Sequence, residues 1–376
     1  MEVVHARKMR IYPDDAQKQK INQTLGHCRY VYNKMLERNQ KVYKRRGEHL
    51  NYYAMRNLLP QMKRYLPWLK EADSQALKYA CRQINTAYDR FFKKRGGYPK
   101  FHNKHGRQSY TTTNNTVITV VSRRVKLPCL GWIKSSDKRS WDDNLHVCYA
   151  TISREPDGKY YVSVTYKTEI PDPTFILDRT RFLGLDYKSD GLYMDSNGDP
   201  AEMPHYYRKA QKLLKRRQRQ LAKMKGSRKG EPKSNRFLKT QRRAAKLYRH
   251  ITNQRKDFLQ KRSTEIANRY DGVCIEDLNL RAMANKDFGN GKATNDNGYG
   301  MFTAMLSYKL RERGKPLIKV DKWYPSSQLC SCCGHRQKMP LNVRTYRCPE
   351  CGTVIDCDVN AAVNIRNEGI RILESA

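Results

Sequence analysis

The chain has 376 residues, of which 75 are Lys or Arg and 36 are Asp or Glu, so its formal net charge is +39 at pH 7. A chain of this length can bury a core and is expected to hold two or three domains. Repulsion among so many positive charges destabilises a compact state unless a polyanion neutralises it, which indicates a nucleic-acid partner. A basic ribosomal protein or a membrane-surface protein is the alternative.

The N-terminus, MEVVHARKMRIYPDD, lacks the apolar core of a signal peptide. No apolar run approaches the roughly 20 residues that span a membrane. We therefore expect a soluble, cytosolic protein that does not bind membranes. The 25 Tyr against nine Phe favour rings that stack on a ligand while a polar tip stays in water.

In chain order, residues 3–12 alternate as expected for a strand. From residue 14 onward, apolar residues recur at helical spacing. The predicted buried face of this first helix consists of Ile21, Leu25, Cys28, Val31 and Met35. Two further helical stretches follow, near residues 52–65 and 73–95.

Residues 96–104 are a Gly- and Pro-containing break, and the chain to residue 175 is then rich in Thr, Val, Tyr and Ile. Its short alternating runs predict strands. We expect residues 1–13 and 96–175 to form a β-barrel, with the helices of residues 14–95 as an insertion. The segment PDPTF, residues 171–175, is expected to be a linker.

After the linker, RFLGLDYKSDGLYMDSNGDP predicts two strands joined by a Ser-Asp-Gly turn. A long helical hairpin is expected from His205 to about Asn268, broken near residues 226–232. Residues 208–262 contain 22 Lys or Arg and only Glu231 and Asp257 as acids. Basic helix faces are usually just solvated, but here partners for ion pairs are nearly absent, which favours phosphate contact. The candidate contacts are Lys212, Arg216, Arg219, Arg242 and Arg255.

The remaining pattern is that of a mixed α/β domain. DGVCIEDLNL predicts a strand, residues 287–300 a Gly- and Asn-rich loop, and residues 301–313 a helix. One more strand is expected in KPLIKVDKWYPSS, and VNAAVNIRNEGIRIL predicts a closing helix whose Ala361, Ala362 and Ile365 allow close packing.

Three apolar runs end on acids. FLGLD ends at Asp186, VCIE at Glu276 and VIDCD at Asp358. Most lone carboxylates at strand ends are solvated or cap a turn, but three brought together in one sheet repel each other and need divalent cations. Two Mg²⁺ ions suit such oxygen ligands and can flank a scissile phosphate. Asp356 and Asp358 are two residues apart on the same expected strand and could face the same way. Asp356 is therefore the alternative to Asp358 as the third metal ligand.

Six of the eleven cysteines lie within residues 330–357. The other five, which are isolated and expected to be small apolar or spectator residues, are Cys28, Cys81, Cys129, Cys148 and Cys274. In a reducing compartment such clustering favours a metal over disulfides.

Four of the clustered cysteines have the spacing C-x2-C-x14-C-x2-C of a structural zinc ribbon, with one Zn²⁺ bound by Cys330, Cys333, Cys348 and Cys351. Gly334 and Gly352 permit the tight turn after each pair. Cys332 is a surplus thiol that could exchange with a ligand, and strand alternation would turn Cys357 into the core, away from the acids.

The ordered segments GLDYKSDGLYMDSNG, NQRKDFLQKRST, CIEDLNL, YPSSQLCSCCG and CPECGTVIDCDVNAAVNI resemble TnpB, a family of transposon-encoded RNA-guided nucleases related to type V CRISPR effectors. RIYPDDAQKQKINQTLGHCRYVYNKML, DSQALKYACRQINTAYDRFF and GYPKFHNKHGRQSY resemble its wedge and recognition regions. The resemblance spans nearly the whole chain.

The resemblance implies an α+β multidomain protein with four parts. These are a wedge barrel (residues 1–13 and 96–175), a helical recognition domain (14–95), a RuvC-like, RNase H-type nuclease domain (176–325 and 353–376) and an inserted zinc ribbon (326–352). Asp186, Glu276 and Asp358 would be its metal-binding catalytic acids.

The resemblance also implies a guide RNA from the transposon end and a double-stranded DNA target with a short adjacent motif. The residues expected near that motif are Tyr53, Ser74, Gln75, Lys78 and Arg82.

The chain departs from the family in two places. Tyr187, Lys188 and Ser189 replace a Gly- or Leu-rich segment, and Gln260 replaces a His found in many members. The chain has no second nuclease motif, so a single site would cut both DNA strands in turn. An RNA-guided repressor without cleavage and a strand-transfer transposase are the rival interpretations.

Overall fold

The computed structural model of the chain describes residues 2–141, 145–169, 178–228, 230–284, 291–340 and 343–375. The chain divides into two compact units, Met1–Ile170 and Pro171–Ala376. The linker expected at residues 171–175 lies outside the described residues. No helix among the described residues is long and apolar enough to cross a membrane.

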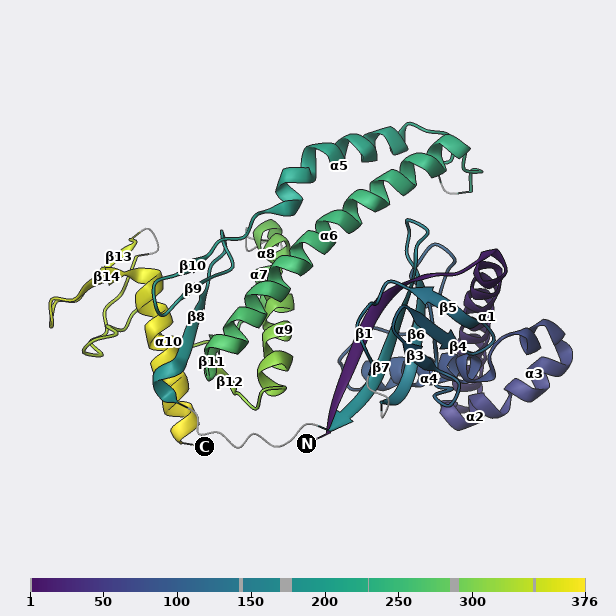
Figure 1. Ribbon diagram of the computed structural model, residues 1–376, viewed down its shortest axis with the longest axis horizontal. Coiled ribbons are helices and arrows are strands. Elements are labelled where there is room, and N and C mark those ends of the chain that lie inside the picture. The colour runs from purple at the N-terminus through teal and green to yellow at the C-terminus, as the bar shows by residue number, and fades with distance from the viewer. Residues whose placement is uncertain are drawn as a thin grey trace. The chain divides into compact units, whose positions relative to one another are not determined.

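The N-terminal unit is built on a seven-stranded antiparallel sheet in the order β2-β6-β7-β1-β5-β4-β3 (Figure 1). Its strands are β1 (Glu2–Tyr12), β2 (Gln108–Thr112), β3 (Thr119–Val121), β4 (Arg124–Leu127), β5 (Gly131–Ser135), β6 (His146–Arg154) and β7 (Tyr160–Glu169). The long central strand β1 pairs with β7 along nearly its whole length, from Glu2 opposite Glu169 to Ile11 opposite Tyr160.

The expected closed barrel is not formed among the described residues, because β2 and β3 are opposite edges of the sheet and do not pair with each other. β3 has only three residues and none of them is fully buried, so it offers little to a closing partner. Helices complete the core instead. A continuous apolar cluster joins Ile21 and Leu36 of the first helix to Val125 and Val162 of the sheet.

The helices of this unit are α1 (Asp15–Arg46), α2 (Tyr52–Asn57), α3 (Leu59–Tyr65), η1 (Pro67–Glu71) and α4 (Ser74–Phe92). α1 begins with a capping box between Asp14 and Gln17 and ends at Gly47, which has a left-handed φ of 69°. The face predicted for α1 from residue spacing is confirmed, since all five of its residues are buried.

The C-terminal unit contains a five-stranded sheet in the order β10-β9-β8-β11-β12. Its strands are β8 (Phe182–Tyr187), β9 (Tyr193–Asp195), β10 (Pro200–Ala201), β11 (Gly272–Glu276) and β12 (Leu317–Val320), and a short turn of 3₁₀-helix, η2 (Arg179–Arg181), precedes β8. β8, β11 and β12 are parallel, whereas β9 runs antiparallel to β8.

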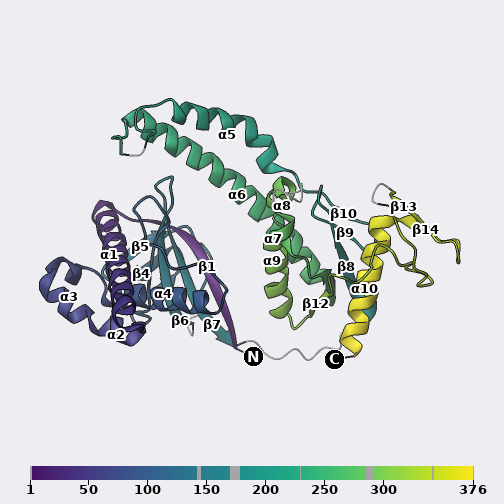
Figure 2. The same ribbon diagram turned by 180° about the vertical axis from the view of Figure 1, so that it is seen from behind.

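Helix α10 (Cys357–Glu374) lies along β8 in both views (Figures 1 and 2). Two glycines allow this approach. A Cβ on Gly184 of β8 would overlap the carbonyl oxygen of Ala362, and one on Gly369 of α10 would overlap the sulfur of Cys274. The close packing predicted for Ala361, Ala362 and Ile365 is confirmed, since all three are buried.

The predicted hairpin consists of α5 (Tyr206–Ala222) and α6 (Asn235–Arg269), and α5 runs alongside the first half of α6 (Figures 1 and 2). Three helices follow β11: α7 (Leu280–Met283), α8 (Gly291–Asn297) and α9 (Tyr299–Arg311).

The prediction of a loop at residues 287–300 is wrong from residue 291 onward, where α8 and the start of α9 lie. Tertiary hydrogen bonds hold α8 in place, and local Gly and Asn content does not register them. Asp296 Oδ1 accepts from the Tyr207 N–H at 3.3 Å, and Asn297 Nδ2 donates to the Ser189 carbonyl oxygen at 2.7 Å.

A small two-stranded sheet pairs β13 (Thr345–Arg347), which precedes the second cysteine pair, with β14 (Val354–Asp356), which follows that pair and leads into α10. Its apolar centre is Tyr346, which is fully buried beside Cys330 and Cys348. The Tyr346 hydroxyl donates to the carbonyl oxygens of Gln328 and His335, at 3.2 and 3.3 Å.

Candidate active site and metal centre

Two of the predicted acids lie at the carboxyl ends of neighbouring parallel strands. Leu185 of β8 pairs with Ile275 of β11, and Asp186 and Glu276 are the next residue on each strand. Residues in register on adjacent strands point to the same face of a sheet. The topology therefore places these two carboxylates side by side at one edge.

The third acid comes from α10, which packs on this sheet. Asp358 lies in the first turn of α10 and not on a strand, because the strand β14 ends at Asp356. The strand-alternation argument for Asp356 and Asp358 is therefore wrong. Oδ1 of Asp356 accepts from the backbone N–H groups of Asp358 and Val359, at 2.9 and 3.1 Å, so this side chain serves as the helix N-cap.

Cys357 is likewise helical, and its half-buried side chain packs against the Tyr346 cluster. The pKa of this thiol is raised by burial and by the nearby charges of Asp356 and Asp358.

The charges of Glu276 and Asp358 both act on Asp186. Burial raises the pKa of Asp186 well above its usual value, and the negative charges of Glu276 and Asp358 raise it further. Burial also raises the pKa of Glu276, and a hydrogen bond from Ser326 opposes that rise. A partly buried cluster of like charges is costly without a cation, and its donors are all carboxylate oxygens, which suit Mg²⁺.

Two basic side chains contact Asp358. Lys188 Nζ lies 3.3 Å from its Oδ2, and Arg344 NH1 lies 3.8 Å from its Oδ1. Sequence reasoning treated Lys188 only as a family departure and did not single out Arg344. The only feature of the sequence that could have indicated a role for Lys188 is its position two residues after Asp186, an expected metal ligand.

Ser326 was also missed by sequence reasoning. Its hydroxyl donates to Glu276 Oε1 at 2.7 Å, and the backbone of the same segment is held by the amides of Asn360 and Asn364. Asn364 Nδ2 donates to the Ser326 carbonyl oxygen at 2.8 Å, and Asn360 Nδ2 donates to that of Leu329 at 2.7 Å. Helix α10 therefore anchors the segment that leads from the acids to the cysteines.

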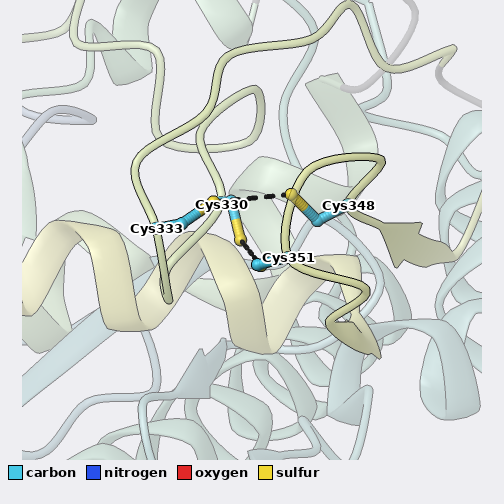
Figure 3. Close-up of side chains that lie close together, drawn as sticks. All are labelled: Cys330, Cys333, Cys348 and Cys351. Carbon is cyan, nitrogen blue, oxygen red and sulfur yellow. Dashed lines mark hydrogen bonds between the residues drawn. The ribbon is translucent and has the colours of Figure 1, made fainter.

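The four predicted cysteine ligands converge (Figure 3). Their sulfur atoms all lie within 4.8 Å of one another. Cys330 Sγ is 3.6 Å from Cys351 Sγ, and Cys333 Sγ is 3.5 Å from Cys348 Sγ. Zn–S bonds of about 2.3 Å in a tetrahedron place sulfurs about 3.8 Å apart, so the cluster fits a four-thiolate metal site.

The two cysteine pairs have the same backbone geometry. The N–H of Gly334 donates to the Cys330 carbonyl oxygen, and the N–H of Gly352 donates to that of Cys348. Both glycines have a left-handed φ, 77° and 71°, as predicted for the two turns. Cys332 is exposed and is not among the four clustered sulfurs.

The candidate hairpin contacts differ in their surroundings. Lys212, Arg216, Arg219 and Arg242 are exposed. Arg255 is half-buried, and its NH1 donates to the carbonyl oxygens of Asn295, at 2.7 Å, and Asp296, at 3.3 Å. Its guanidinium is thus already engaged in joining α6 to α8.

The candidate motif-reading residues lie in the helical part of the N-terminal unit. Ser74, Gln75, Lys78 and Arg82 follow one another along α4, and none of them is fully buried. The Ser74 hydroxyl accepts from Lys63 Nζ at 2.7 Å. Tyr53 on α2 is 64% exposed, with the Arg56 guanidinium 5.5 Å from the centre of its ring.

Three family models match the chain. Residues 299–365 match "Cas12f1-like, TNB domain", residues 165–287 match "Probable transposase", and residues 1–48 match "Helix-turn-helix domain". The last range contains one strand and one helix, β1 and α1, in this structure.

Relatives and a solved structure agree with these matches. A candidate RNA-guided DNA endonuclease of Streptomyces pristinaespiralis is 34% identical, over 98% of this chain and 90% of its own. Another, InsQ of Escherichia coli K12, is 29% identical over 99% of this chain and 94% of its own.

The fold is similar to that of a Cas12f1 chain solved with its single guide RNA and target DNA. The TM-score is 0.57 at 13% identity, over 97% of this chain and 99% of the other. The chain belongs to the TnpB family. This follows from its full-length similarity to the Streptomyces protein, from the matched family models and from the ordered sequence motifs.

Proposed function

We propose that this protein is an RNA-guided DNA endonuclease with a single metal-dependent active site. The observation that carries the proposal is the placement of Asp186 and Glu276 on neighbouring parallel strands, together with the electrostatics of Asp186. Burial raises the pKa of Asp186, and the charges of Glu276 and Asp358 raise it further. Three acids from β8, β11 and α10 are costly to bring together, and cation binding accounts for that cost. The relatives named as RNA-guided DNA endonucleases support the same activity.

The three acids would hold Mg²⁺, of which two ions suit hydrolysis of a phosphodiester. When bound, the metal supplies an activated water and stabilises the leaving 3′ oxygen. Asp186 and Glu276 are held by the strand register, and Ser326 orients Glu276. Asp358 is presented by the first turn of α10, whose N-cap is Asp356, so we assign Asp358 and not Asp356 as the third ligand.

The four cysteines would bind one structural Zn²⁺, since four thiolates leave no position for a reactive water. The unit Met1–Ile170 would supply the wedge and recognition parts, with Tyr53 and the exposed side of α4 near the target-adjacent motif. The remainder would supply the RuvC-like domain and the ribbon.

A transposon-end guide RNA and its DNA target are the proposed partners. The exposed basic residues of the hairpin, Lys212, Arg216, Arg219 and Arg242, would contact phosphates. We expect the protein to act in the prokaryotic cytosol.

The test uses full-length protein purified with its RNA. Wild type should cut DNA that matches the guide only when Mg²⁺ or Mn²⁺ is present. Asp186→Asn should still bind that DNA but lose cleavage by at least about a thousandfold, the scale of removing a group central to catalysis. Cleavage retained by Asp186→Asn would refute the site. Guide-specific binding without cleavage by wild type would favour the repressor alternative.

A further inference from the structure

The turn after Asp186 brings a positive charge to the acid cluster. Lys188 lies between β8 and β9, and its Nζ is 3.3 Å from Asp358 Oδ2. About 38% of the Lys188 side chain and 23% of the Asp358 side chain are exposed. The Lys188 charge also reaches Asp186, where it opposes the rise in pKa. One ammonium group therefore acts on carboxylates from both the sheet and α10.

The backbone of Lys188 is held in place. Asn297, which is fully buried at the end of α8, donates from Nδ2 to the carbonyl oxygens of Lys188, at 3.3 Å, and Ser189, at 2.7 Å. The N–H of Gly191 donates to the Lys188 carbonyl oxygen at 3.3 Å, and the N–H of Lys188 donates to that of Leu192 at 3.4 Å. The lysine stem thus starts from a fixed point beside the acids, unlike that of a freely rotating surface lysine.

The other groups near the three acids offset the negative charge of the acids less than Lys188 does. Arg344 is the second basic partner of Asp358 in the described residues, but its distance is 3.8 Å and its side chain is 75% exposed. Ser326, which contacts Glu276, is neutral. In the described part of the chain, the shortest ion pair of the three acids is that between Lys188 and Asp358.

We propose that Lys188 is a built-in counter-ion that competes with divalent cations for Asp358. This inference rests on the proposed metal-dependent function. In the cation-free protein the ammonium offsets part of the repulsion among the acids. A cation can use both oxygens of Asp358 only after the ammonium has moved away, and the flexible lysine stem allows that movement. Lys188 would thus raise the cation concentration at which the site fills, and with it the concentration needed for cleavage.

The test measures cation binding as well as activity. Mn²⁺ is titrated into the full-length protein with its RNA, and free Mn²⁺ is followed by electron paramagnetic resonance. Binding by Asp186→Asn is subtracted, so that cations on the RNA cancel. Lys188→Met keeps the apolar stem and removes the charge. Removing one charge a few ångströms from a divalent ion should tighten Mn²⁺ binding on the order of tenfold. The Mg²⁺ concentration for half-maximal cleavage should fall in parallel.

Two further variants separate charge from shape. Lys188→Arg retains the positive charge and should bind Mn²⁺ within about twofold of wild type. Lys319→Met removes a lysine from an exposed ion pair with Asp277, 2.6 Å long, and should leave Mn²⁺ affinity unchanged. Equal or weaker Mn²⁺ binding by Lys188→Met would overturn the inference, as would Lys188→Arg behaving like Lys188→Met. In those cases the proposed function would stand, provided that Asp186→Asn abolishes site-specific Mn²⁺ binding and cleavage.

Discussion

The hydroxyl of Ser326 donates a 2.7 Å hydrogen bond to Oε1 of Glu276, and it does so from a buried position. This bond opposes the effect of burial, which raises the pKa of Glu276. It therefore favours the charged form of Glu276, the form that would bind a cation, and fixes the direction of its carboxylate.

Ser326→Ala should accordingly weaken cleavage about tenfold, the lower end of what loss of a group supporting a metal ligand costs. The measurement is the cleavage rate against Mg²⁺ concentration, and the defect should shrink as Mg²⁺ is raised. Ser327→Ala, which changes the adjacent exposed serine, is the matched control and should cut like wild type. Equal rates for the two variants would mean that the Ser326 contact has no role in the site.

The position of Asp186 should cost stability. A carboxyl group whose pKa is higher in the folded than in the unfolded chain stabilises the fold only while it is protonated, and that contribution is lost as pH rises through the folded pKa. At pH 7 without divalent cations, Asp186→Asn should therefore melt higher than wild type, by at least about 2 °C. The difference should narrow as pH falls through the raised pKa of Asp186.

Asp178→Asn is the control, because the pKa of Asp178 is shifted in the opposite direction to that of Asp186. The Thr180 side chain and then its N–H lower the pKa of Asp178, so this carboxylate contributes stability above its unfolded pKa that is lost as pH falls. Its replacement should not raise the melting temperature at pH 7. Scanning calorimetry in EDTA at several pH values measures both variants once zinc retention has been verified. A lower melting temperature for Asp186→Asn at pH 7 would contradict the prediction.

The close approach of α10 to β8 depends on the absence of a side chain at residue 184. Gly184→Ala would place a Cβ against the Ala362 carbonyl oxygen and the backbone of Arg366, so helix and strand must separate. We expect a loss of about 3 kcal/mol, at the upper end for overpacking, and a displaced Asp358. Thermal unfolding and the cleavage rate would both report it.

Gly26→Ala provides the comparison. A Cβ on Gly26, inside α1, meets only the guanidinium end of Arg29 at 4.0 Å. Alanine should stabilise α1 by about 0.5–1 kcal/mol, because glycine is the poorer helix former. Gly184→Ala tolerated as well as Gly26→Ala would disprove the packing argument.

Parts of the site could be predicted because their determinants are local. An apolar run followed by an acid identifies Asp186 and Glu276 at strand ends, and two glycine-terminated pairs identify the cysteine turns. Strand and helix were not separable at Asp358, because the apolar run Val354–Ile355 is only two residues long and the helix cap, Asp356, follows at once.

Other features depend on contacts between distant segments. The open edges of the seven-stranded sheet follow from pairing between residues as distant in the chain as Glu2 and Glu169, and α8 depends on the hydrogen bonds of Asp296 and Asn297 to distant segments. The proposed role of Lys188 depends on its distance to Asp358, and that of Ser326 on its distance to Glu276. Residue spacing in the sequence predicts neither distance.

The exposed hairpin cations should set the salt dependence of RNA binding. Replacing Lys212, Arg216, Arg219 and Arg242 together by Gln removes four exposed charges. If each contacts a phosphate, the slope of log affinity against log salt should become shallower by about 3. Filter binding of the RNA at several salt concentrations measures the slope.

The control makes the same change in net charge elsewhere. Gln at Lys8, Lys18, Lys34 and Lys41 removes lysines that are each paired with a carboxylate in the N-terminal unit. This variant should change the slope by less than about 1, since these charges are already compensated. Equal slopes for the two variants would show that net charge, and not the hairpin, governs binding.

Loss of the proposed Zn²⁺ from the four-cysteine cluster should slow cleavage by displacing Asp358. Cys348→Ser removes one of the four clustered thiols that would bind the proposed Zn²⁺ and so hold the two cysteine turns together. The ribbon is joined to α10 by Asn360, whose Oδ1 accepts from the Ser331 N–H at 2.9 Å, and β14 runs directly into the helix turn that carries Asp358. Disorder in the ribbon should therefore displace this acid while the β8 and β11 acids stay in place.

We expect Cys348→Ser to contain less than about half the zinc of wild type by atomic emission, to cut at least about a hundredfold more slowly, and to retain its RNA. Cys332→Ser, which removes the exposed thiol outside the cluster, should keep full zinc and full cleavage. Zinc loss in Cys332→Ser would show that this thiol does exchange into the cluster. Cleavage by zinc-free Cys348→Ser at the wild-type rate would show that the position of Asp358 does not depend on the ribbon.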